Sequence, residues 1–428
     1  MAQIVRMEQD RLVVRVPMSR PFLVGLIVGF FWLLPVSGPP RRDVFEGEIT
    51  VLRVLRLVLP LAVWLLVERR EAARLLHSFL YRFPAGRFPL LPLRIAAFCL
   101  VLGFFPLLAG LLNRSVPYIV SVVAPLVLSV LVLVAIVLLE ERALREWALG
   151  VCFAALAFLI VGLLRFGFSE SSFFGRPRAM MGFTHPLITA SAALSAMLFF
   201  GLYGRERLSR RWRVPARILP PVYALVTFFL LQISQSRNML LSTLVALCLY
   251  LLARHTSALT RIAVFVPLLI GPMLFYAFVL YSPPTDPLWE WLNAQSSHRL
   301  GYYQKLLRDL VEMGGSAIAP DANRLDAISE QLGFAAADSV FLSYLVNYGI
   351  GSLCLLVLLF GVIGWQLARS RQNALAFGIF GGLMVFYNLD AQGLTASNLI
   401  VFILFAYTVR CALRYAVRPV QEAAATGP

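Results

Sequence analysis

The sequence has few charged residues, and this scarcity excludes an ordinary soluble protein. Only 14% of the 428 residues are charged, whereas a soluble globular domain carries about 25%. Apolar residues make up 60% of the chain, and they recur in long runs from one end to the other. We therefore predict a single membrane domain that covers residues 1–428.

Lysine is nearly absent, because Lys305 is the one lysine among 38 basic residues. The net charge is nevertheless +16, which is compatible with nucleic acid, an anionic membrane surface or an anionic substrate as partner. The arginines lie between the apolar runs and do not gather in one compact domain. This distribution argues against nucleic acid and leaves membrane lipids and an anionic substrate as expected partners.

Metal-binding patterns are also lacking. The five cysteines all lie in apolar runs, and none has the C-x-x-C spacing of a zinc site or of a redox pair. Phosphate-handling Mg²⁺ sites need paired carboxylates, and the nearest group of carboxylates is the loose set Asp43, Glu46 and Glu48. We therefore expect no metal and no cofactor.

The apolar runs are long enough to cross a membrane as helices. About 20 mostly apolar residues span a hydrocarbon core of ~30 Å. By this rule the chain is an all-α, polytopic membrane protein with about 12 transmembrane helices. The predicted spans cover residues 21–38, 48–67, 91–112, 117–139, 144–164, 185–203, 218–234, 238–254, 262–281, 339–364, 373–389 and 397–414.

The distribution of arginine orients these spans. Cytoplasmic loops of membrane proteins carry an excess of Lys and Arg, and the densest basic segments here are residues 68–90 and Arg205–Arg213. With the N-terminus inside, both segments fall on the cytoplasmic side of the membrane. We therefore predict that both termini are cytoplasmic.

One connection between spans is far longer than the others. Residues 282–338, between the ninth and tenth spans, form an extracytoplasmic loop in this topology, and loops of such length are usually functional. Apolar residues recur in it at helical spacing, with charged residues between them: Leu300, Tyr303, Leu306, Leu307, Leu310 and Val311. We therefore expect a partly helical loop, with an amphipathic helix that lies on the membrane surface.

Arg237 lies in a short turn between the seventh and eighth spans. It begins the eighth span, where free N–H groups and the helix dipole favour an anion. Its guanidinium could bind two oxygens of a phosphate group, or it could reach the lipid headgroups and anchor the helix. Arg176 and Arg178, in the outer connection before the sixth span, favour phosphate binding, because outer segments seldom carry spare arginines.

Further polar and aromatic residues lie in the predicted outer segments. His185 begins the sixth span, where it either caps the helix or binds a sugar or phosphate. In the long loop, His298 and Arg299 stand beside Tyr302 and Tyr303. These two rings could stack on sugars, or they could belong to an interfacial amphipathic helix.

Two carboxylates are candidate general bases for a sugar hydroxyl. Asp338 directly precedes the tenth span, where a carboxylate can also serve as a helix N-cap or as a partner of the helix dipole. Glu170 lies in the outer segment after the fifth span. The sequence does not decide between the two.

Three segments of the chain together resemble the O-antigen polymerase and ligase family of bacteria. The segment Arg178–Pro186 (RAMMGFTHP) is similar to the family's entrance to a span, and Ser236-Arg237 is similar to its turn before an apolar helix. The segment Asp338–Gly351 resembles the family's exit from its large loop. Asn238 stands where a Gly often follows the Arg, and Asp338 stands where ligases usually have His, which favours the polymerases.

The resemblance implies a Wzy-type polymerase in the bacterial inner membrane. Such a metal-independent glycosyltransferase joins undecaprenyl-pyrophosphate-linked repeat units into O-antigen or exopolysaccharide at the outer face. With the interpretation of the residues above, the resemblance implies that Arg237, with Arg176 or Arg178, binds the pyrophosphate. It also implies that Asp338 or Glu170 accepts the proton of the attacking sugar hydroxyl. A chain-length regulator and a flippase of the same pathway are the implied partners.

Two other functions remain open at the level of sequence. An O-antigen ligase would transfer the glycan to lipid A–core, with similar motifs. A lipid-linked oligosaccharide transporter would be no enzyme and would need polar residues along a path through the membrane.

Overall fold

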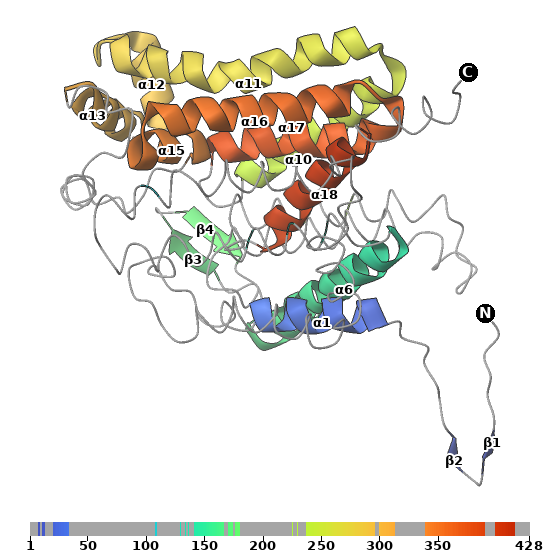
Figure 1. Ribbon diagram of the computed structural model, residues 1–428. Coiled ribbons are helices and arrows are strands. Elements are labelled where there is room, and N and C mark those ends of the chain that lie inside the picture. Colours follow the sequence, from blue (N-terminus) through green and yellow to red (C-terminus); the bar gives the residue numbers. More distant parts are fainter. Residues whose placement is uncertain are drawn as a thin grey trace, which may run out of the picture.

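The computed structural model describes six longer segments of the chain: residues 20–33, 141–166, 237–295, 299–312, 339–389 and 399–415. It also describes two short hairpins and the single helical residues 108, 129, 133, 136, 225 and 229. The hairpins pair β1 (Met7–Glu8) with β2 (Arg11–Leu12) and β3 (Glu170–Phe173) with β4 (Arg176–Ala179). Otherwise this part of the chain is helical, which confirms the helical character that the sequence predicts (Figure 1).

Four of the described helices are long and apolar enough to cross a membrane. They lie in α6 (Glu141–Phe166), α10 (Arg237–His255), α11 (Ala258–Tyr281) and α16 (Ile350–Ala368). Three further helices are apolar and shorter: α1 (Arg20–Leu33), α17 (Ala374–Leu389) and α18 (Leu399–Tyr415). Each of the seven overlaps a predicted span.

The other five predicted spans fall almost wholly outside the described residues. They are the spans at 48–67, 91–112, 117–139, 185–203 and 218–234. The total of about twelve therefore stays a prediction, while the membrane-spanning character of the described helices agrees with their length and composition.

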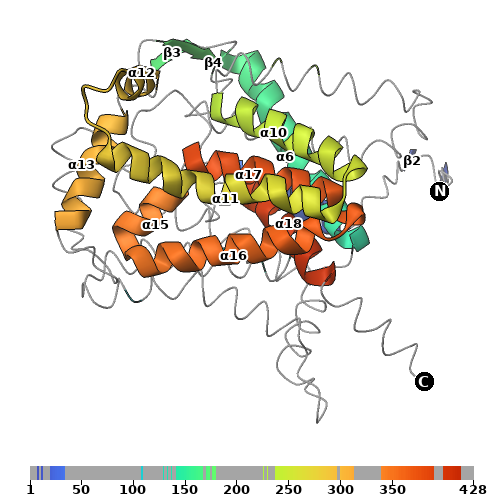
Figure 2. The same ribbon diagram turned by 90° about the horizontal axis from the view of Figure 1, so that it is seen from above.

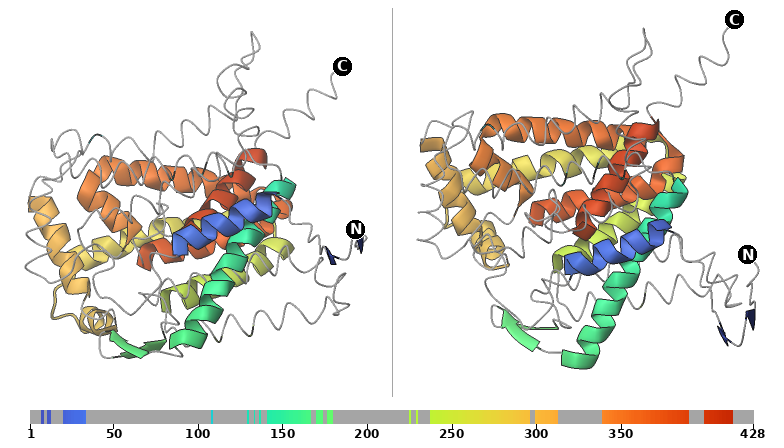
Figure 3. Two further views of the ribbon diagram at one scale, coloured as in Figure 1. Left: turned by 90° about the horizontal axis from the view of Figure 1, so that it is seen from below. Right: turned by 60° about the horizontal axis from the view of Figure 1, so that its bottom comes forward.

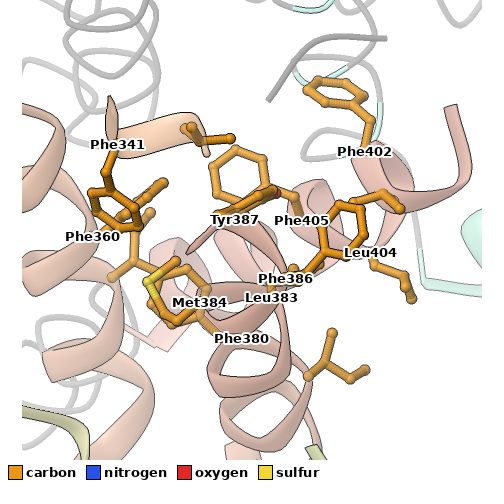
Figure 4. Close-up of a cluster of buried hydrophobic side chains, with 14 of the residues drawn as sticks. Phe341, Phe360, Phe380, Leu383, Met384, Phe386, Tyr387, Phe402, Leu404 and Phe405 are labelled. Carbon is orange, nitrogen blue, oxygen red and sulfur yellow. The ribbon is translucent and has the colours of Figure 1, made fainter. Parts of the chain in front are cut away.

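Helix α17 forms the core of the C-terminal bundle. It packs against α10, α11, α15 (Val340–Tyr348), α16 and α18, and most of its side chains are buried (Figures 1 and 2). Figure 4 shows the aromatic cluster at its end, where Tyr387 stacks on Phe360 of α16 with ring centroids 5.8 Å apart. Phe341 and Phe405 each meet Phe360 edge to face. These contacts join three helices and α15 into one packed unit.

Helices α1 and α6 form a second close pair, and glycines permit the approach. A Cβ at Gly25 would lie 2.0 Å from the carbonyl oxygen of Trp147, and a Cβ at Gly150 would lie 2.1 Å from that of Phe22. Small residues at points of such close approach are typical of helix–helix contacts in membranes. Farther along the contact, Gly29 lies against Val151 and Ala154, and the ring centroids of Phe30 and Phe158 are 5.3 Å apart. Residue numbers therefore rise together along the pair, and the two helices run parallel.

A parallel pair constrains the membrane topology. Two parallel spans must be separated by an odd number of crossings, and the sequence predicts three spans between the first and the fifth. The direction of α1 relative to α6 therefore agrees with the predicted alternation.

The predicted tenth span is wrong as one continuous helix. Residues 339–364 instead contain α15 (Val340–Tyr348), a break at Gly349, and then α16, which continues to Ala368. Gly349 has φ 83° and ψ 175°, a conformation that is essentially restricted to glycine. Figure 2 shows the two helices meeting at a sharp angle. The segments on both sides of Gly349 are mostly apolar, so the hydropathy of the sequence does not indicate the break.

Ser352 links the two helices across the break. Its hydroxyl lies 2.8 Å from the carbonyl oxygen of Tyr344 and 2.7 Å from that of Gly349. Because Ser352 lies in the first turn of α16 and Tyr344 lies in α15, this contact holds the two helices together at the break. Helix α16 alone, with 19 residues, is long enough to span.

The long loop is partly helical, as predicted. It contains α12 (Pro287–Gln295), which the sequence pattern did not reveal, and α13 (Arg299–Glu312), which it did. Five of the six predicted apolar positions of α13 are buried, but Val311 is 59% exposed. Because α13 packs against α11, α12 and α15, its apolar side faces protein. The prediction that this helix lies with that side on the membrane surface is therefore wrong.

Candidate functional site

Three helix termini meet at one end of the C-terminal bundle, which we call the Leu389 end. At the start of α10, Asn238 Nδ2 donates to the carbonyl oxygen of Leu389 at 2.9 Å. At the start of α15, Ser339 Oγ lies 3.3 Å from the carbonyl oxygen of Tyr387. The residues that directly follow Arg237 and Asp338 in the sequence therefore both bond to the last turn of α17.

Ser339 is the junction of three helices at the Leu389 end. Its hydroxyl is hydrogen-bonded to the hydroxyl of Tyr276 in α11 as well as contacting the carbonyl group of Tyr387. It also accepts a hydrogen bond from Leu342 N at 3.4 Å and so caps α15. The N-cap of α15 is thus Ser339 and not Asp338. The helix-cap interpretation of Asp338 is removed, while its roles as a partner of the helix dipole and as a general base stay predictions.

Arg237 is the first residue of α10, as the sequence predicts. Its backbone is described and its side chain is not. The 19-residue helix that follows it directs its free N–H groups and the positive end of its dipole toward the Leu389 end. This terminus is therefore suited electrostatically to an anion.

The segment with Arg176, Arg178 and Glu170 forms the β3–β4 hairpin. Arg176 pairs with Phe173, Arg178 with Ser171, and Glu170 with Ala179. Because successive strand residues alternate between faces, the two arginine positions share one face of the hairpin and Glu170 belongs to the other. The hairpin lies toward the end of the molecule that holds α12 and α13 (Figures 2 and 3).

The candidate residues of the long loop divide into two groups. His298 lies outside the described residues, as do His185 and Asp338, and Arg299 begins α13. Tyr302 and Tyr303 are each only 7% exposed, and their ring centroids lie 5.9 Å apart. A sugar stacks on an exposed ring face, so the expected stacking surface is not formed by these two tyrosines. Their burial follows from the packing of α13 on protein.

Gln304 is a structural residue that the sequence analysis missed. Its Nε2 donates to the carbonyl oxygens of Val279, at 2.9 Å, and of Ser282, at 2.7 Å. It is 5% exposed, and it satisfies carbonyl groups at the C-terminus of α11 that have no partner within the helix. A lone polar residue on the apolar side of α13 was the available signal.

We expect that Gln304→Met loosens α13 from the bundle. Methionine keeps the length of the side chain but leaves the two carbonyl groups without their donor, at a cost of about 1–3 kcal/mol for each buried group left unsatisfied. The measurement is hydrogen–deuterium exchange of residues 299–312 in the purified protein, which should become faster. Arg308→Met, at an exposed position one turn farther along the same helix, is the control and should leave the exchange rate unchanged.

The described architecture is that of a helical protein with several helices suited to cross a membrane. A scan of protein-family models and searches of curated proteins and of solved structures found no match to this chain. Among the described residues, no group of three or more His, Cys, Asp or Glu is placed to hold a metal ion.

Proposed function

We propose that this protein is a Wzy-type polysaccharide polymerase. The observation that carries the proposal is the meeting of two distant segments at the Leu389 end. Asn238 and Ser339, which follow Arg237 and Asp338, both contact the last turn of α17. A phosphate-binding arginine and a general base must lie near each other to act on one glycosyl donor, and this convergence supports such an arrangement.

In the proposed reaction, the donor is a glycan on undecaprenyl pyrophosphate. An acceptor hydroxyl of a second lipid-linked repeat unit attacks the anomeric carbon, and the bond from that carbon to the pyrophosphate oxygen breaks. The pyrophosphate leaves with the electron pair, and Arg237 at the N-terminus of α10, with Arg176 or Arg178, stabilises its charge. The hydroxyl proton passes to Asp338 or Glu170.

Two features of the described residues support Asp338 over Glu170 as the base. The N-cap of α15 is already supplied by Ser339, so the carboxylate of Asp338 is not needed to cap the helix. Glu170 is on the opposite face of its hairpin from the two arginine positions. We therefore propose Asp338 as the base, and Arg176 and Arg178 as candidate partners of Arg237.

We further propose that the Leu389 end faces the outside of a bacterial inner membrane. The opposite end of the bundle carries exposed arginines at the ends of α10 and α16, namely Arg254, Arg369 and Arg371. By the positive-inside rule that end is cytoplasmic. This orientation agrees with the predicted one, and it supports the proposal, because the proposed reaction takes place on the outer side of the membrane.

The proposal is tested with the full-length protein in phospholipid vesicles. Undecaprenyl-pyrophosphate-linked repeat units are added, and the glycan length is followed on gels. We expect a ladder of longer glycans and released undecaprenyl pyrophosphate, with and without EDTA. Elongation that requires lipid A–core would instead assign a ligase, and movement of the lipid-linked glycan across the bilayer without any change in glycan length would assign a transporter.

A further inference from the structure

Helix α12 carries an apolar surface outside the membrane-spanning helices. Leu288 is 54% exposed and Trp291 is 59% exposed. They stand three residues apart and therefore share one side of the helix. Exposed Trp and Leu side chains on a short helix next to a membrane span are typical of the layer between lipid tails and water.

The other side of α12 fixes this surface in place. Trp289 is buried at the contact with α13, and Asn293 Oδ1 accepts a hydrogen bond from Gly301 N of α13 at 3.1 Å. Asp286 begins the helix by accepting a hydrogen bond from Leu288 N at 2.8 Å. Helix α12 is therefore fixed by Asp286 at its start and by contacts with α13 along its length, so the position of its exposed side is fixed as well.

A stripe of exposed apolar residues runs along α11, the helix that precedes α12 in the sequence. Five of its six exposed large apolar residues recur at spacings of seven and four residues, namely Leu259, Val266, Ile270, Leu274 and Tyr281, and the sixth, Phe275, is next to Leu274. In a helix that spans a membrane, such a stripe faces lipid. Tyr281 is 81% exposed, and α12 begins six positions after it, at Pro287.

The charges of the neighbouring helices identify which part of the loop contacts lipid. The exposed side of α13 carries Lys305, Arg308 and Glu312 and is suited to water. Glu290, which is exposed, is the only charged residue in α12 (Pro287–Gln295). Attraction to anionic headgroups therefore does not hold α12, and its binding to lipid depends on Leu288 and Trp291.

We propose that α12 lies in the headgroup layer of the bilayer and inserts Leu288 and Trp291 among phospholipid molecules. The long loop is thereby held against the membrane by α12, while α13 faces water. The occupant of this surface is bulk phospholipid, bound through apolar and aromatic contact and not through charge. The inference depends on the spanning helices and not on the proposed enzymatic function.

The test uses the tryptophan fluorescence of the full-length protein in vesicles. Trp291→Phe and Trp289→Phe are compared with the parent in phosphatidylcholine and in phosphatidylcholine brominated on its acyl chains. The parent-minus-W291F spectrum reports Trp291, and we expect brominated lipid to quench it. The parent-minus-W289F spectrum reports the buried neighbour and should be quenched far less, which makes W289F the matched control.

Lipid composition provides a second readout. Because the surface lacks basic residues, replacing part of the phosphatidylcholine by phosphatidylglycerol should leave the quenching of Trp291 unchanged. Equal quenching of Trp289 and Trp291, or no quenching of Trp291, would overturn the proposal. Quenching that appears only with phosphatidylglycerol would also overturn it, since a charge-dependent contact would then hold the loop.

Discussion

Replacing Arg237 by Ala should abolish polymer while the protein is still made and inserted. Arg237 begins α10 at the Leu389 end, where the helix dipole already favours an anion. Loss of one well-placed donor to a developing negative charge lowers turnover by about 10²–10³-fold in other enzymes. We expect an effect of that size on elongation in vesicles, read as loss of the glycan ladder.

Arg237→Lys separates charge from geometry. Lysine keeps the positive charge but cannot bind two phosphate oxygens with one planar group. We therefore expect a residual ladder of short glycans, intermediate between the parent and Arg237→Ala. Arg254→Ala is the matched control, because Arg254 is an exposed arginine at the other end of the same helix. It should leave the length of the ladder unchanged.

These variants also distinguish a chemical role from an anchoring role. If Arg237 only held α10 at the headgroup layer, Arg237→Ala would lower the amount of folded protein, and the surviving protein would elongate glycan at the parent rate. Full-length polymer from Arg237→Ala at normal protein level would show that the pyrophosphate role is wrong.

The spans could be predicted from the sequence because membranes impose a length and a composition. Twenty apolar residues are sufficient to identify a crossing, and each of the long described helices overlaps a predicted span. The helical part of the long loop was also predictable from the spacing of Leu300, Leu306 and Leu307, which are all buried. Periodicity shows that one side of a helix is apolar, but it does not show whether protein or lipid covers that side.

That limit explains the errors at α13 and α12. The buried side of α13 includes Tyr302 and Tyr303, whose packing on protein removes them from a sugar-binding surface. Helix α12 is nine residues long and gives too short a pattern for periodicity to identify. Its exposed Trp291 became meaningful only beside the buried Trp289.

The arrangement of the candidate site depends on contacts between residues far apart in the sequence. The bond from Asn238 to Leu389 joins positions separated by 151 residues, and that from Ser339 to Tyr387 joins positions separated by 48. Ser339 looks like an ordinary residue at the start of an apolar run. In the structure it caps α15, and its hydroxyl also contacts α11 and α17.

Gly382→Val should disrupt the fold, because the contact between α10 and α17 has no room for a side chain. A Cβ at Gly382 would lie 2.5 Å from the carbonyl oxygen of Ser242, and one at Gly378 would lie 2.5 Å from that of Ala246. Overpacking costs about 1–3 kcal/mol in general, and a backbone carbonyl cannot turn aside as a side chain can. We expect a cost at or above the upper end of that range.

The measurement is the melting temperature and the monodisperse fraction of the protein in detergent. Gly271→Val is the matched control, since a Cβ at Gly271 of α11 meets nothing within 4 Å. The contrast is sharper with alanine: Gly271→Ala should be neutral or stabilising, because alanine favours a helix over glycine by about 1 kcal/mol, whereas Gly382→Ala should destabilise. Equal melting temperatures for Gly382→Ala and Gly271→Ala would contradict the close approach of the two helices.

The same contact connects stability to the candidate site. Ser242 lies about one helical turn from Asn238 in α10, and Gly382 lies about two turns from Leu389 in α17. A side chain at Gly382 would therefore separate the two helices close to the hydrogen bond between Asn238 and Leu389. If Gly382→Ala protein remains folded at a lower temperature, the displaced start of α10 should still reduce elongation, because a misplacement of about 1 Å can lower a rate by about 10²-fold. Gly271→Ala, in a neighbouring helix with open space, should elongate glycan as the parent does. If folded Gly382→Ala protein elongates glycan normally, the contact between α10 and α17 stabilises the fold but does not affect the activity.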